Sequence, residues 1–156
     1  MVYVSVNYRF SQKFDVPVDK AFSWAIDYDP GSADWKRMGL EGDRRITKLT
    51  DDTIILDDTR PTSEGPVTKK RLIRIDHERR SFVNTHIGGP TPHSQFVYEF
   101  LAEKGGGSRL DFTGMLVLQM NKKPSASEVA KIAAGERRGD SKIWKNLAKA
   151  MESEVG

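Results

Sequence analysis

The chain has 156 residues and a mass of 17.6 kDa, the usual size of one domain, so we expect a single domain over residues 1–156. Hydrophobic residues make up 37% and charged residues 30% of the chain, which is typical of a globular protein and excludes a disordered one. Cysteine is absent and the net charge is only +3, which excludes disulfides and thiol chemistry and argues against a nucleic-acid partner.

The first part of the chain predicts a strand followed by helices. Apolar residues at every second position from Val2 predict a strand over residues 2–16. Pro17 then suits the first position of a helix that carries an apolar stripe. A short second helix is expected over residues 33–38, around Trp35.

Six further strands and a long helix are expected after these helices. The strands cover residues 44–49, 53–60, 67–76, 81–87, 93–103 and 108–120. Turn-forming Asp, Pro and Gly residues separate them, and the short connections predict an antiparallel meander. Ser125 or Ser127 is a candidate cap for a closing helix that runs to about Val155. Only this helix is long enough to cover the concave face of the sheet.

Several local patterns resemble one known family. The stretch Val16-Pro17-Val18-Asp19-Lys20-Ala21-Phe22-Ser23-Trp24-Ala25-Ile26-Asp27, followed by Trp35, is similar to its strand, Pro, aromatic-bearing helix, Asp and later Trp. Residues 76–80 resemble its charged hairpin, and residues 96–100, 105–107 and 109–112 resemble its last two strands and the turn between them. The chain thus resembles the START/Bet v 1-like (SRPBCC, helix-grip) superfamily, in its polyketide cyclase-like branch.

This resemblance implies a fold and a kind of site. The fold is α+β: a seven-stranded curved antiparallel sheet wrapped around a long C-terminal helix, with two short helices between strands 1 and 2. The family implies a cavity between the sheet and the last helix for a hydrophobic or amphipathic, lipid- or polyketide-like molecule. Family catalytic residues differ between subfamilies, so the resemblance assigns none here.

The last two long strands supply the expected floor of that cavity. Their alternating apolar residues predict a lining of Phe96, Tyr98, Phe100, Leu110 and Phe112. Tyr98 is either a core group with a satisfied hydroxyl or a ligand contact, and Trp35 is either a core anchor or a ligand contact. The longer connections at 60–66, 88–92 and 121–124 share one end of the meander and are the expected mouth.

Basic residues form the expected rim. Side chains alternate faces along a strand, so either Lys70 alone or Lys69 together with Arg71 points inward. We take Lys70 as the candidate ligand contact. An inward basic group suits an amphipathic and perhaps anionic ligand, and the alternative is a solvated strand end.

Two histidines flank the 88–92 connection. His86 and His93 predict either surface side chains, an acid/base pair or two metal ligands. Asp58 is the one plausible third ligand, because His77 belongs to a turn at the opposite end. We therefore expect no metal.

The closing helix has a polar middle. Glu136 and Asp140 lie on the same stripe as the apolar residues before and after them, and Gly135 and Gly139 accompany them. One interpretation is a break or an exposed kink at the glycines. The other is a continuous helix whose carboxyl groups face the cavity.

These patterns favour a carrier or sensor of a small molecule. The alternatives are a cofactor-free cyclase, aromatase or dehydratase, in which His86, His93, Tyr98 or Glu136 would move protons, and a protein–protein module. We expect no cofactor, no transmembrane segment and a cytoplasmic location. The oligomeric state stays open.

Overall fold

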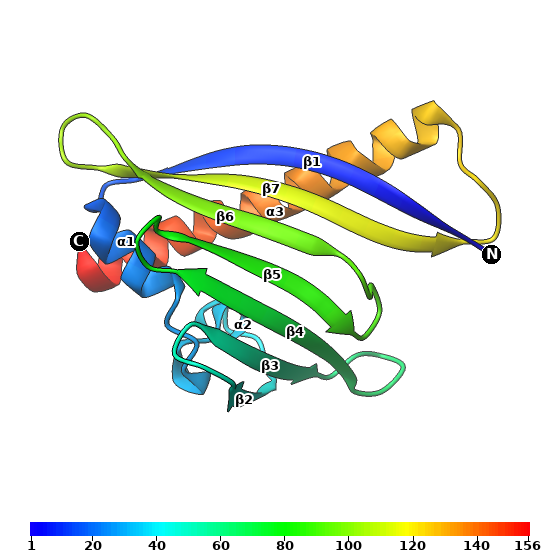
Figure 1. Cartoon of the computed structure of the whole chain (residues 1–156), viewed down its shortest axis with the longest axis horizontal. Coiled ribbons are helices and arrows are strands. Elements are labelled where there is room, and N and C mark those ends of the chain that lie inside the picture. The colour runs from blue at the N-terminus through cyan, green and yellow to red at the C-terminus, as the bar shows by residue number, and fades with distance from the viewer.

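The computed structural model describes residues 1–156 and consists of a curved sheet with a long helix across one face (Figure 1). The strands are β1 (Val2–Phe14), β2 (Asp43–Lys48), β3 (Thr53–Arg60), β4 (Val67–Asp76), β5 (Ser81–Gly88), β6 (Gln95–Ala102) and β7 (Ser108–Met120). The helices are α1 (Val18–Ala25), α2 (Asp34–Arg37) and α3 (Ala126–Val155), with a 3-10 turn η1 (Pro30–Ser32) before α2. The predicted α+β helix-grip architecture is confirmed.

The sheet has seven antiparallel strands in the order β1-β7-β6-β5-β4-β3-β2. Strands β2 to β7 form the predicted meander, and β1 closes it by pairing with β7 along its full length. Figure 1 shows α3 running behind the sheet, with α1 near the C-terminal end of α3 and α2 beside β3. No helix combines the length and the apolar character needed to cross a membrane.

Helix α3 is continuous, so of the two interpretations of its glycines the break is wrong. Ser125, and not Ser127, is the cap: its Oγ accepts from the Glu128 N–H at 3.1 Å, while the Glu128 carboxylate accepts from the Ser125 N–H at 2.9 Å. Gly135 and Gly139 each cost about 1 kcal/mol relative to Ala in a helix. Apolar residues before and after them pack on the core and hold the helix together across them.

Two strand ends differ by two residues from the predicted ones, and the other ends agree to within one residue. β1 stops at Phe14, and Pro17 precedes the first turn of α1 as its N-cap. β6 begins at Gln95, because His93 has a φ of +73° and its N–H donates to the His86 carbonyl at 2.9 Å in a tight turn. A residue in this conformation cannot continue the strand.

The core fills only one part of the space under the sheet. Phe14, Phe22, Phe100 and Trp144 pack together where α1 and the C-terminal half of α3 meet the strands, with ring centroids 5.8–6.4 Å apart. Farther along the concave face, the space between sheet and α3 stays open.

Candidate functional site

A pocket lies between the concave face of the sheet and α3. Its volume is about 420 Å³, within the range of small-molecule pockets, which is roughly 300–1,000 Å³. Residues from β1, β2, β4, β5, β6, β7, α3 and the α1–α2 segment line it. The expected mouth is only partly confirmed: Thr91 from the 88–92 connection reaches the pocket, while no residue of 60–66 or 121–124 does.

The floor of the pocket is a row of aromatic rings on adjacent strands. Phe82, Tyr98 and Phe112 lie side by side on the inner face of β5, β6 and β7, because the register pairs Phe82 with Tyr98 and Tyr98 with Phe112. Their centroids are 4.3 Å and 5.1 Å apart. Trp144 of α3 approaches Tyr98 from the opposite side at 5.8 Å. This surface suits a flat apolar ligand.

A buried ion cluster borders the pocket on β2, β3 and β4. Asp58 is 5% exposed and accepts two hydrogen bonds from Arg44, at 2.7 Å and 2.8 Å, and one from Arg71. Burial alone would raise the pKa of Asp58, but the Arg44 hydrogen bonds and the Arg71 charge outweigh it and lower the pKa. Asp58 therefore stays ionised and fixes both guanidinium groups.

The polar middle of α3 forms the opposite wall. Asp140 accepts a hydrogen bond of 2.5 Å from the Tyr8 hydroxyl, and Glu136 lies one turn away. Burial raises the pKa of both carboxyl groups, and for Glu136 the neighbouring Asp140 adds to this rise. The structure thus favours the interpretation in which these carboxyl groups face a cavity.

His86 and His93 do not form a pair. His86 is 8% exposed, lines the pocket and lies 3.1 Å from the Thr91 hydroxyl through Nδ1. Burial, together with the charges of Arg71 and Lys69, lowers the pKa of His86 to about 4, so its ring is neutral at pH 7. His93 is exposed and packs against the Tyr3 ring, because its positive φ turns the side chain away from the pocket.

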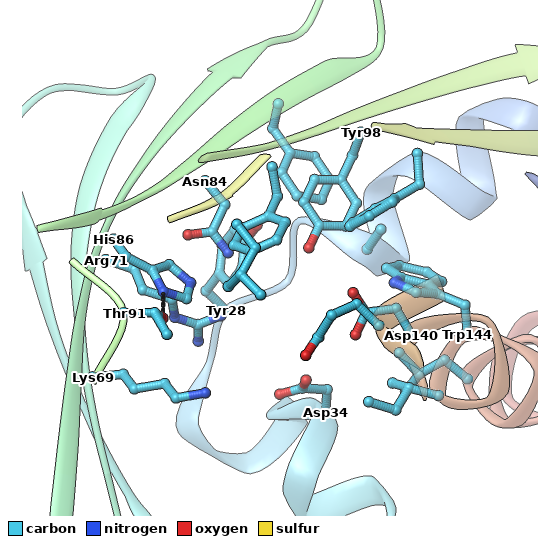
Figure 2. A pocket seen from close by; sticks show the side chains of 18 of the residues that line it. Tyr28, Asp34, Lys69, Arg71, Asn84, His86, Thr91, Tyr98, Asp140 and Trp144 are labelled. Carbon is cyan, nitrogen blue, oxygen red and sulfur yellow. Dashed lines mark hydrogen bonds between the residues drawn. The ribbon is translucent and has the colours of Figure 1, made fainter. Parts of the chain in front are cut away.

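Figure 2 shows how the labelled polar groups surround the pocket, with Lys69 and Arg71 across from Asp140 and the Tyr98 hydroxyl pointing into the space. Lys70 points outward instead, where its ammonium is 3.8 Å from Asp57. The candidate Lys70 is therefore replaced by Lys69 and Arg71, which share the inner face with the fully buried Ile73.

The structure brings together six of the candidate site residues and separates the others. Those that line the pocket are His86, Phe96, Tyr98, Phe112, Glu136 and Asp140. Phe100 and Leu110 are buried in the core and do not line the pocket; Phe22 of α1 and Trp144 of α3 pack against Phe100. Trp35 is buried, apart from both the pocket and the main core cluster.

Sequence reasoning missed several lining residues. They include Tyr8, Trp24, Tyr28, Asp34, Arg44, Asn84 and Trp144. The strand alternation contained a signal for two of them, since Tyr8 shares a face with Val6, and Asn84 shares a face with Phe82 and His86. No pattern indicated the residues of the α1–α2 segment.

Comparisons with known proteins identify the fold through solved structures and not through sequence. No family model matches the chain, and no curated protein matches its sequence. Solved structures match over nearly its whole length. Ara h 8.0201 is 16% identical, covers 97% of this chain and 100% of its own, and has a TM-score of 0.71.

Two enzymes are also similar in structure. The Zhui aromatase/cyclase from Streptomyces sp. R1128 is 12% identical with a TM-score of 0.75, over 98% of this chain and 97% of its own. Norcoclaurine synthase from Thalictrum flavum, solved with dopamine and hydroxybenzaldehyde, is 16% identical with a TM-score of 0.68, over 99% of this chain and 90% of its own. The chain has the Bet v 1-like helix-grip fold that these proteins share.

Proposed function

We propose that the protein binds a hydrophobic or amphipathic small molecule between the sheet and α3, as a carrier or sensor. The observation that carries this proposal is the 420 Å³ pocket with its aromatic floor. Apolar surface buried there contributes roughly 25 cal/mol per Å² before the costs of association. The fold is shared with Ara h 8.0201 and with enzymes that act on small molecules, which is consistent with such a site.

A cofactor-free enzyme of the cyclase, aromatase or dehydratase kind is the second candidate. The hydrogen bond between Tyr8 and Asp140, beside Glu136, favours it, because half-buried carboxyl groups with a raised pKa can act as general acids in enzymes. Binding without chemistry is better supported, since no hydrogen bond joins His86, Tyr98 and Glu136 and His93 lies outside the pocket. Recovery of a bound molecule chemically unchanged after long incubation would distinguish the carrier from the enzyme.

Native mass spectrometry of protein purified without detergent tests the binding proposal. We expect a noncovalent adduct of a small molecule, and we expect Ile143→Trp to lose it because the indole would occupy the pocket. Ile46→Trp is the matched control, since Ile46 is 38% exposed on the edge strand β2. Equal adducts in both variants, or no adduct in any protein, would count against the proposal.

A further inference from the structure

The outward side of α3 carries a row of basic residues, which we call the basic stripe. All of its members are exposed, and they are Lys131, Arg138, Lys142, Lys145 and Lys149. An α-helix turns by about 100° per residue, so these positions fall within roughly 60° of its circumference, opposite the side that carries Asp140 and Leu147. With a rise of about 1.5 Å per residue, the basic stripe is about 27 Å long.

No acidic residue balances the basic stripe. Between Glu128 and Glu152, the only carboxyl groups of α3 are those of Glu136 and Asp140, and both line the pocket on the other side of the helix. None of the five basic side chains belongs to an ion pair of the structure. The outward side of α3 is therefore a surface of one charge.

The spacing within the basic stripe does not stabilise the helix. Arg138, Lys142, Lys145 and Lys149 follow one another at intervals of four, three and four residues. Residues at these intervals are neighbours on the surface of a helix, and like charges there destabilise it. Exposed helices gain stability when opposite charges take such positions. The stability of α3 thus does not account for the basic stripe, and an external anionic partner does.

The position of the stripe favours a lipid surface as that partner. Clusters of basic residues on a helix bind anionic lipid headgroups, and each Lys or Arg near the surface raises the affinity by roughly fivefold. The apolar side of α3 is already occupied, because it packs on the core and lines the pocket. The helix therefore cannot insert its apolar side into a bilayer, and the attraction is electrostatic and sensitive to salt.

A nucleic acid is the other common polyanion, and the stripe suits it less. Proteins that bind single strands stack the bases on aromatic side chains. Trp144 is the only aromatic residue of α3, and it is buried on the side away from the stripe. The pocket beneath the helix has an aromatic floor, and an apolar molecule that fits it partitions from water into membranes.

We propose that the basic stripe docks the protein on an anionic membrane surface, with α3 parallel to that surface. The docking goes beyond the proposed binding of a small molecule, although the preference for lipid over nucleic acid rests on that function. The pocket then lies on the other side of the helix that contacts the membrane.

Sedimentation with lipid vesicles tests the inference. Vesicles of phosphatidylcholine with about 30% phosphatidylserine offer an anionic surface, and phosphatidylcholine alone offers a neutral one. We expect binding to the anionic vesicles only, and loss of binding when salt is raised from about 0.1 M to 1 M, which shortens the screening length from about 10 Å to 3 Å. The double variant Lys142→Gln, Lys145→Gln should bind roughly 25-fold more weakly.

A second double variant with the same loss of charge is the control. Arg74→Gln, Lys104→Gln also lowers the net charge of +3 by two. Arg74 is exposed on the outer face of β4, next to the buried Ile73, and Lys104 is exposed in the turn between β6 and β7. We expect this variant to bind anionic vesicles as the unaltered protein does. Both variants should fold, because all four positions are exposed and Gln suits a helix about as well as Lys.

The outcomes separate the docking from the proposed function. Equal weakening in the two double variants, equal binding to neutral vesicles, or no binding to anionic vesicles would overturn the docking. Tighter binding of a short DNA duplex than of anionic vesicles would overturn it in favour of a nucleic-acid partner. Vesicle binding by the stripe in a protein that retains no small-molecule adduct would support the docking while the proposed function fails.

Discussion

Removal of the charge of Asp58 should destabilise the protein strongly. The Arg44 side chain is 3% exposed and the Arg71 side chain 17% exposed, and Asp58 is the anion that both contact. The change Asp58→Asn keeps the size of the side chain but leaves two guanidinium groups buried around a neutral amide. Loss of one partner from a buried ion pair costs about 3–5 kcal/mol.

A change of this size is readily measured. For a chain of this length, it corresponds to a fall in Tm of about 9–15 °C. Urea unfolding, followed by fluorescence of the three tryptophans, would give the free energy of unfolding directly. The low pKa of Asp58 adds a pH signature: the wild type keeps this stabilisation above the pKa of the unfolded carboxyl, and loses it as the pH falls through the lower folded pKa.

Asp57, the residue before Asp58, provides a matched control. Asp57 points outward and lies 3.8 Å from the ammonium of Lys70, whose side chain is 49% exposed. An exposed pair of this kind contributes about 0–1 kcal/mol, so Asp57→Asn should change stability little. Similar losses in the Asp57 and Asp58 variants would refute the conclusion that the Asp58 cluster is a buried structural unit.

Three further predictions concern the cap of α3, the neutral histidine and the floor of the pocket. Ser125→Ala should lower the free energy of unfolding by about 1 kcal/mol and Ser127→Ala by much less, and equal effects in urea titrations would contradict the capping assignment. His86 should titrate near pH 4 by NMR, and a pKa near 6.5 would contradict its burial. Because the folded pKa of His86 lies below the unfolded one, protonation of His86 should lower the free energy of unfolding as the pH falls from about 6.5 to 4. His86→Gln should remove this pH dependence. Phe112→Ala should weaken naphthalene and 2-naphthol binding alike, whereas a loss confined to 2-naphthol would contradict its place in the apolar floor.

The fold was predictable because its signals are local. Turn residues bounded the strands, and alternating apolar residues marked the first strand and the last two, so the meander followed from the short connections. The continuity of α3 through Gly135 and Gly139 was left open, because it depends on how the flanking apolar residues pack on the sheet.

The candidate site was only partly predictable, because it depends on tertiary placement. Leu72 and Ile73 are adjacent and both apolar, so the pattern of β4 did not reveal whether Lys70 or Arg71 points inward. Phe100 shares the inner face with Phe96, but α1 covers it and leaves Phe96 at the pocket. The rotation of His93 out of the site comes from one left-handed backbone conformation.

The indole N–H signals of two tryptophans test the central claim most directly. Trp144 lines the pocket, and Trp35 is buried outside it. In a titration with 2-naphthol followed by nitrogen–proton NMR, we predict a saturable shift of the Trp144 signal while the Trp35 signal stays in place. A Trp144 signal that does not respond to saturating probe, or a saturable shift confined to Trp35, would contradict binding between the sheet and α3.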